Sequence, residues 1–272
     1  MLIEYETFLE KLNDKIKSGE DFYVELLKNI IKNPNRYCGI FRLTNIKTKL
    51  LQNVTQSHEI KFGDFMEEIL TEYIGLLGYE NLPKVIGKGP DGNDLNADQF
   101  FKKENNLYLV EQKVRDDHDS TKKRGQYENF YNKVKCIRQK YPKYHVIAVM
   151  WFIDDTLKKN RKFYYNKMKE TYFDDCKLKL CYGGEFFDYL DAGDLVWDEI
   201  VKYLSYRKKN TKDEEIVIPD FGNSEEIYEA MLKLPYKEYK KLFSEAPQYK
   251  QLREELFEYG DNLEKVKKNR PL

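Results

Sequence analysis

The feature that most constrains the fold is a long apolar run from Tyr144 to Ile153, interrupted only by His145 near its start. A run without polar alternation predicts a strand that is buried on both faces of a sheet. A shorter β-favouring run, from Leu107 to Val114, precedes it. A helix with one apolar stripe is predicted between the two, from about Gln126 to Lys140. The chain therefore predicts a sheet whose central strand lies under covering helices.

The strand from Leu107 to Val114 is predicted to form a hairpin with the segment before it. Leu95 to Phe101 is the expected partner strand, and the turn is expected within 102–106, where two asparagines favour a turn. This turn would place Phe101 opposite Leu107.

Polar residues appear at the far end of this strand, on a face that begins apolar. Because side chains on a strand alternate between faces, Leu107, Leu109, Glu111 and Lys113 share one face. That face changes from apolar to charged along the strand. We expect it to leave the core and enter a cleft at Glu111.

A second acid for this cleft has three candidates in the lead-in: Asp91, Asp94 and Asp98. Asp94 and Asp98 have the same parity along the strand, so the alternation of faces does not separate them, and a bulge or a register slip would reverse both. Position along the hairpin favours Asp94, which would lie at the open end beside Lys113.

Two carboxylates and a lysine in this arrangement suit the chemistry of phosphodiesters. Mg²⁺ takes oxygen ligands, often one or two carboxylates together with phosphate oxygens and waters. Bound metal activates water and stabilises transition-state charge, and a nearby lysine adds positive charge. The sequence therefore predicts a Mg²⁺ site at Asp94 and Glu111, with Asp98 as the alternative to Asp94 and Lys113 beside the reacting phosphate.

These residues resemble the PD-(D/E)xK nuclease superfamily, whose first acid, second acid and lysine match Asp94, Glu111 and Lys113. Gly92-Asn93-Asp94-Leu95 is similar to the Gly-x-Asp-apolar form of its first motif, with Asn93 where the literal motif has proline. The order of strand, charged loop and helix also fits. Over about residues 55–205 the chain is most similar to type II restriction endonucleases.

The resemblance implies an α/β fold with a central mixed β-sheet flanked by helices. It also implies Mg²⁺-dependent cleavage of double-stranded DNA at a short specific site by a homodimer. Gln126 would point toward the site from the following helix. A structure-specific or repair nuclease of the same fold, and a non-catalytic DNA-binding module, are the alternatives.

Glu59 is a third acid to weigh. A helix is predicted to start at Ser57, and helical spacing puts Glu59 at the core-side edge of its apolar stripe. Glu59 would then either point toward the metal site or serve as a first-turn acid favoured by the helix dipole, paired with Lys61 or Arg42.

Charge is balanced over the chain but not locally. With 47 basic and 47 acidic residues, the net charge of zero argues against a protein that coats DNA nonspecifically. Residues 102–143, however, hold twelve Lys or Arg against six Asp or Glu. Such clusters are commonly solvated faces, but here they flank the predicted metal site. The expected DNA contacts are Arg115, His118, Lys122, Lys123 and Arg124.

Glycine, proline and charged segments divide the chain into three parts. Residues 1–52 are expected to form a helical segment, 53–207 the nuclease core, and 208–272 a helical segment packed on the same domain, after a charged linker at 208–215. The four cysteines lack the spacing of a zinc site. We expect a cytoplasmic protein with reduced thiols, because the sequence shows neither a signal-peptide pattern nor an apolar stretch long enough to span a membrane.

Overall fold

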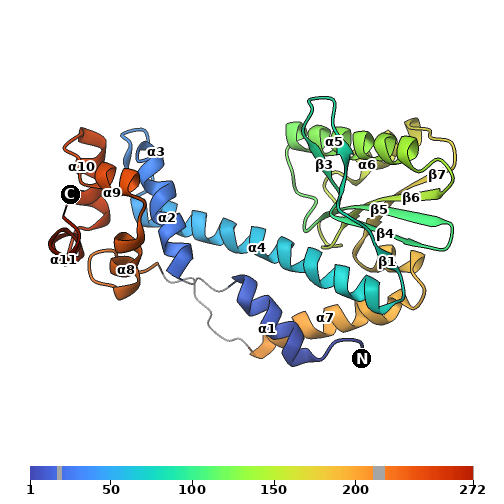
Figure 1. Ribbon diagram of the computed structural model, residues 1–272, viewed down its shortest axis with the longest axis horizontal. Helices are drawn as coiled ribbons and strands as arrows, with labels where there is room; N and C mark the ends of the chain where they lie inside the picture. The colour runs from blue at the N-terminus through green and yellow to red at the C-terminus, as the bar shows by residue number, and fades with distance from the viewer. Residues whose placement is uncertain (17–19, 211–217, 272) are drawn as a thin grey trace. The chain divides into compact units, whose positions relative to one another are not determined.

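The computed structural model describes residues 1–16, 20–210 and 218–271. Contacts divide the chain into two compact units. Unit 1 comprises Met1–Leu12 and Phe62–Lys212, and unit 2 comprises Asn13–Lys61 and Asp213–Leu272. The long helix α4 (Ile46–Leu76) contributes residues to both units (Figure 1). The three-part division expected from the sequence therefore has different boundaries from the two units.

Unit 1 is built on a five-stranded sheet in the order β1-β4-β5-β6-β7. Strands β1, β4 and β5 pair antiparallel, whereas β5, β6 and β7 pair parallel, so the sheet is mixed. The strands are β1 (Glu80–Asn81), β4 (Gln99–Lys103), β5 (Asn106–Lys113), β6 (His145–Phe152) and β7 (Cys176–Tyr182). Strand β6 is buried on both faces from Ala148 onward, which confirms the prediction from the apolar run.

Helices cover both faces of this sheet (Figure 1). On one face, α5 (Ser120–Lys140) and α6 (Arg161–Glu170) bury their apolar stripes against Leu107 and Leu109 of β5 and Met150 of β6. On the other face, Trp151 contacts Phe186 and Phe187 of the 3₁₀ helix η1 (Gly183–Tyr189). The part of α1 (Tyr5–Ile16) up to Leu12, the helix α7 (Gly193–Asn210) and the second half of α4 complete the unit. The predicted α/β fold with a helix-flanked mixed sheet is confirmed.

The hairpin that precedes β5 differs from the expected one. The predicted partner strand is split, because β3 (Asp94–Asn96) pairs with β2 (Val85–Lys88) in a separate two-stranded sheet and only β4 pairs with β5. The expected register is wrong by one residue, since Phe101 faces Tyr108 and not Leu107. The cause is a tight turn: Lys103 pairs with Asn106, which leaves two residues in the loop, and Glu104 adopts a φ of 53°.

Two helices start earlier than the sequence predicted. Helix α4 begins at Ile46, so Ser57 lies inside it, and the Asn45 side chain accepts a hydrogen bond from the Thr48 amide at 2.9 Å. Helix α5 begins at Ser120, where Asp119 caps the amides of the first turn. In both places a short polar side chain caps the earlier start, and no proline interrupts the segment that follows.

Unit 2 is helical over its described residues and has its own core. Leu27, Ile30 and Leu50 pack there with Met231 and Leu252, so the segments before and after the nuclease core share one interior. Its helices are α2 (Glu20–Lys32), α3 (Asn35–Cys38), the first part of α4, α8 (Glu225–Lys233), α9 (Tyr236–Leu242), α10 (Pro247–Leu256) and α11 (Asn262–Asn269). Of the predicted linker, 208–210 end α7, and 211–215 lie outside the described residues.

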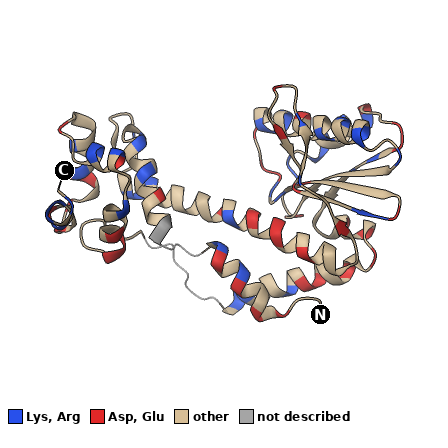
Figure 2. Cartoon of the chain, viewed as in Figure 1, with Lys and Arg blue, Asp and Glu red and all other residues tan. Residues whose placement is uncertain are grey.

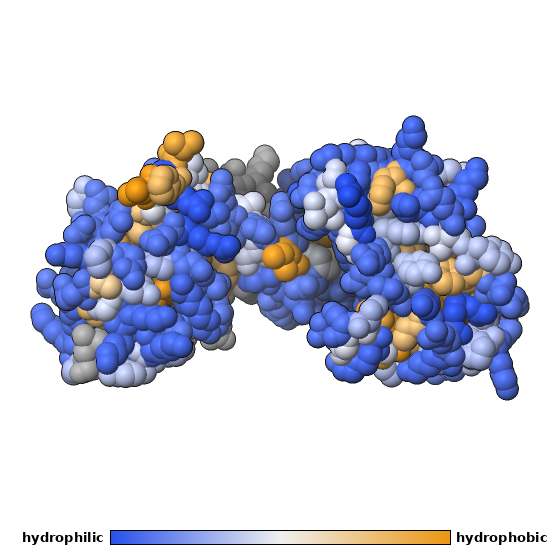
Figure 3. Space-filling view, turned by 90° about the horizontal axis from the view of Figure 1, so that it is seen from above, coloured by the Kyte–Doolittle hydropathy of each residue, from blue (hydrophilic) through white to orange (hydrophobic). Residues whose placement is uncertain are grey.

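The face of the molecule in Figure 3 is mainly hydrophilic, with small separate hydrophobic patches. Across the described ranges, no helix has both the length and the apolar character that a membrane crossing demands.

Candidate active site

The end of β5 brings two carboxylates and an ammonium group together. Glu111 and Lys113 project from the same face of β5, and Asp98 lies immediately before β4. The Lys113 Nζ donates to Asp98 Oδ2 at 2.9 Å and lies 2.7 Å from Glu111 Oε1. Asp98 is fixed in this position because its Oδ2 also accepts the Gln112 backbone N–H at 2.7 Å. The sequence-predicted pair Glu111 and Lys113 is thus joined by Asp98.

Three oxygens converge on the Lys113 ammonium, because the Gln112 carbonyl accepts from Nζ at 2.7 Å as well. Burial alone would lower the pKa of Lys113. The negative charges of Glu111 and Asp98, together with their hydrogen bonds, outweigh burial and raise that pKa. Lys113 is therefore a cation at neutral pH, suited to attract a phosphate and not to take a proton from water.

A second lysine, Lys133 of α5, contacts the other oxygen of Glu111, Oε2. The side chains of Glu111 and Lys133 are each only 5% exposed, so Glu111 is a buried carboxylate held between two ammonium groups. Sequence reasoning missed Lys133. The sequence did indicate that Lys133 is buried. Lys133 lies three residues after Phe130 and four before Ile137, so its charge falls on the apolar stripe of α5 that packs on the sheet.

Asp94 lies in a different part of unit 1. It belongs to the β2–β3 hairpin, where its carboxylate is half exposed and forms an ion pair with Lys88 at 2.7 Å. Asp91 lines the same pocket as Asp94, between this hairpin and α5. Of the three candidate acids, the structure brings Asp98 to Glu111 and Lys113.

The other two predicted catalytic residues have different surroundings. Glu59 is exposed in the middle of α4, within the residues assigned to unit 2 and not in a first helical turn. Gln126 lies in α5, and its Oε1 accepts a hydrogen bond from the Tyr164 hydroxyl at 2.8 Å. The α5 side chain that contacts Glu111 is Lys133.

A buried polar cluster fixes the loop that follows β5, and sequence reasoning did not find it. Asp116, which is fully buried, accepts from the Asn160 backbone N–H at 2.9 Å and from the Tyr182 hydroxyl at 2.8 Å. The Asn160 side chain in turn donates to the His118 carbonyl at 3.1 Å. Burial, then the hydrogen bond to Asp116, raises the pKa of Tyr182, so this hydroxyl stays protonated. The cluster holds the loop at the edge where the parallel strands end.

The predicted DNA contacts lie on this loop and on the first turns of α5, a helix in which basic residues recur (Figure 2). Lys122 and Arg124 are exposed, whereas Lys123 donates to Asn160 Oδ1 at 3.1 Å and lies over the Phe163 ring. Arg115 and His118 are half-buried in the loop. Burial, with the charges of Lys122 and Lys113, lowers the pKa of His118, which makes its ring neutral at pH 7.

The oxygens at this site fit a divalent metal. Mg²⁺ prefers hard oxygen donors, and it commonly takes one or two carboxylates while waters and phosphate oxygens fill the other positions. Asp98, Glu111 and the Gln112 carbonyl already converge on one cation, the Lys113 ammonium. Elsewhere in the described chain, as here, no group of three or more His, Cys, Asp or Glu side chains is arranged to bind a metal. A site with two carboxylates therefore needs its substrate phosphate and waters to complete the shell.

Comparison with known proteins assigns the family. A search of curated proteins found no match. The family model of the type II restriction endonuclease HinfI matches residues 4–88 and 80–208, which is well over half of the chain and includes the acidic pair, Lys113 and Lys133. Enzymes of this class cleave double-stranded DNA and generally use a divalent metal. The chain therefore belongs to the HinfI family of type II restriction endonucleases.

Proposed function

We propose that this enzyme hydrolyses phosphodiester bonds at a short specific sequence in double-stranded DNA with Mg²⁺, and that Asp98 and Glu111 hold the metal. The observation that carries the proposal is the convergence of Asp98 and Glu111 on Lys113 at distances of 2.9 and 2.7 Å. A structural ion pair alone would not require three oxygen acceptors around one half-buried ammonium at the end of a strand.

Each residue has a distinct task in this proposal. Bound Mg²⁺ lowers the pKa of a water ligand and offsets the charge that develops on the phosphate. Lys113, held as a cation, donates a hydrogen bond to a phosphate oxygen or orients the attacking water. Lys133 fixes Glu111 in one rotamer, and the Gln112 amide fixes Asp98. Lys122 and Arg124, exposed on the first turns of α5, grip the DNA backbone.

A plasmid digest tests the proposal. With Mg²⁺, we expect a small set of discrete fragments whose ends share one sequence. With EDTA in place of the metal, we expect no cleavage, because two carboxylates beside a phosphate are repulsive without a cation between them. A smear, or preferential cutting of branched substrates, would contradict site-specific cleavage. Discrete cutting in EDTA would contradict the metal site.

The same digest reports on assembly. A two-fold dimer places two active sites on the two strands of a symmetric site. We propose such a homodimer, which converts supercoiled plasmid to linear DNA without a lasting nicked form. Accumulation of nicked circles at enzyme excess would instead indicate that one strand is cut at a time.

Lys113→Met is expected to lower the cleavage rate by at least about a hundredfold while changing DNA affinity in Ca²⁺ less than about threefold. The ammonium acts on the reacting phosphate, whereas Lys122, Arg124 and their neighbours supply most of the binding charge. Rate constants from single-turnover reactions and affinities from gel shifts separate the two effects. Lys102→Met, at a partly exposed lysine paired with Glu80, is the control and should cleave like the wild type. An equal loss of affinity and rate in Lys113→Met would contradict its role in the chemical step.

A further inference from the structure

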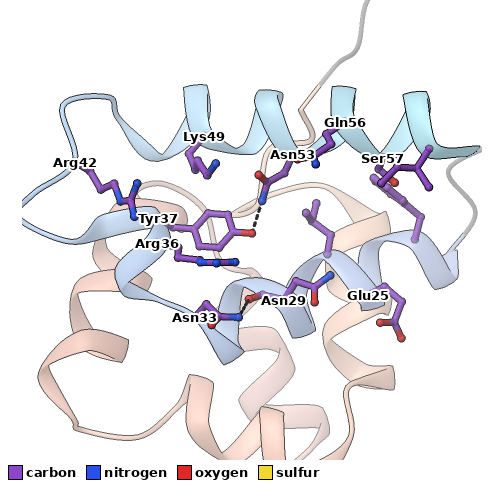
Figure 4. A pocket seen from close by; sticks show the side chains of 13 residues that line it. Glu25, Asn29, Asn33, Arg36, Tyr37, Arg42, Lys49, Asn53, Gln56 and Ser57 are labelled. Carbon is purple, nitrogen blue, oxygen red and sulfur yellow. Dashed lines mark hydrogen bonds between the residues drawn. The ribbon is translucent and has the colours of Figure 1, made fainter. Parts of the chain in front are cut away.

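Unit 2 holds a pocket of 640 Å³ that has no part in the acidic site of unit 1. Helices α2 and α3 form one wall and the first half of α4 forms the other (Figure 4). The residues that line it fall between Phe22 and Ile60, so the family match covers the whole pocket. The C-terminal helices of unit 2 lie outside that match.

Carboxamide side chains face each other across this pocket. Asn29 lies on α2 and Asn33 follows one turn later, just beyond the end of that helix, whereas Asn53 and Gln56 are one turn apart on α4 (Figure 4). The Asn53 amide is oriented by its hydrogen bond to the hydroxyl of Tyr37, a buried residue of the core. Asn and Gln present a donor and an acceptor side by side, the pattern that pairs with the edge of adenine.

The charge of the pocket is mainly positive. Arg36, Arg42 and Lys49 line it with a single acid, Glu25, which is already paired with Lys28. Arg36 and Arg42 are exposed, so their guanidinium groups are accessible to an incoming anion. A pocket with both cations and carboxamides matches a ligand with both phosphates and base edges.

Exposed apolar side chains lie on the loop next to this pocket. Ile40, Phe41 and Leu43 flank Arg42 between α3 and α4, and they are 85%, 92% and 105% exposed. DNA-binding proteins use such protruding apolar side chains as wedges between base steps. The loop therefore adds a third feature that suits nucleic acid.

We propose that this pocket binds the substrate DNA and reads part of its sequence, with Arg36, Arg42 and Lys49 on phosphates and the carboxamides on base edges. The proposal rests on the proposed function, because it takes DNA as the substrate. It assigns sequence discrimination to unit 2 and phosphodiester chemistry to unit 1. Loss of the pocket would therefore change which DNA is bound while leaving the acidic site intact.

The charge arm compares two double variants that remove the same charge. Arg42→Ala with Lys49→Ala empties the pocket of two cations, whereas Lys32→Ala with Lys237→Ala removes two exposed lysines of unit 2 that do not line it. Gel shifts use random-sequence duplex in Ca²⁺ at several salt concentrations. The pocket variant should bind roughly tenfold more weakly, with a salt slope smaller by about 2, and the control should change less than about twofold. Equal effects in both variants would overturn the proposal.

The sequence arm follows where DNA is cut. A duplex library with a randomised segment is digested with Mg²⁺, and the new ends are sequenced. Asn33→Ala with Gln56→Ala should relax at least one position of the cleaved motif, with discrimination there falling roughly 10- to 100-fold. Asn35→Ala with Asn269→Ala, at exposed carboxamides of unit 2 outside the pocket lining, should keep the wild-type motif. An unchanged motif in the pocket variant, with both variants folded by circular dichroism, would overturn the assignment of sequence reading to the pocket.

The experiments distinguish a failure of the pocket proposal from a failure of the proposed nuclease function. If wild-type protein does not cut the library in Mg²⁺, the proposed nuclease activity fails, but the charge arm still tests DNA binding by the pocket. If wild-type protein cuts a defined motif and the pocket variants cut and bind as it does, the pocket proposal alone fails.

Discussion

Asp98→Asn is expected to abolish cleavage, with a fall in rate of at least about a thousandfold, whereas Asp94→Asn is expected to keep near wild-type activity. Asparagine preserves the size of the side chain and one oxygen but removes the negative charge that a divalent metal requires. Asp98 and Glu111 both contact the Lys113 ammonium group. Asp94 is half exposed and forms an ion pair with Lys88 in the separate hairpin. Single-turnover cleavage of a plasmid in Mg²⁺ measures both variants.

The variants Asp98→Asn and Asp94→Asn serve as controls for each other, because each removes one acid from the same short stretch of chain. Binding of a DNA duplex in Ca²⁺ shows whether each variant is folded and competent to bind. Full activity of Asp98→Asn together with an inactive Asp94→Asn would move the metal to the hairpin and contradict the site described above.

Lys133→Ala is expected to destabilise unit 1 by about 3 kcal/mol. The substitution removes one of the two cations around the buried Glu111 carboxylate and leaves a cavity under α5. Urea unfolding followed by tryptophan fluorescence reports on unit 1, because both tryptophans of the chain, Trp151 and Trp197, lie in that unit. Lys135→Ala, at an exposed position two residues along the same helix, should change the unfolding free energy by less than about 0.5 kcal/mol.

A double-mutant cycle with Glu111→Gln tests the cause. If the cost of Lys133→Ala comes from the uncompensated carboxylate, it should shrink by about half or more in the Glu111→Gln background. A cost that is the same in both backgrounds would show that packing of the lysine stem, and not its charge, stabilises the unit.

Local pattern was enough to predict β5 and β6, but not the strand that pairs with β5 in the hairpin. The alternation of faces placed Glu111 with Lys113, and the apolar run from Tyr144 to Ile153 identified a strand covered on both sides, because each depends on a few consecutive residues. The choice between Asp94 and Asp98 was not decidable by parity. It depended on where the partner strand breaks and on a two-residue turn, and a single residue of slip in that turn moves the pairing of the whole strand.

Contacts between distant segments were outside the reach of such reasoning. Lys133 meets Glu111 only because α5 packs back onto β5, and the local sequence shows just a charge on an apolar stripe. Likewise, the sequence patterns at both ends of the chain predicted helices. Nothing in those patterns indicated that Leu27 and Ile30 would share a core with Met231 and Leu252. Tertiary packing decides such partnerships, and several pairings satisfy the same amphipathic pattern.

The length of α4 has a consequence for how the chain resists denaturation. Its first half gives Leu50 and Val54 to the interior of unit 2, and its second half gives Phe65, Ile69 and Tyr73 to unit 1. A helix is a cooperative structure, and fraying at one end weakens the turns beside it. If the interior of one unit unfolds, the half of α4 that packs there loses its contacts. The adjacent turns of α4, which pack in the other unit, are then less stable. A truncation that ends within this helix would expose apolar surface on whichever fragment remains, so the two units are not separable by cutting there.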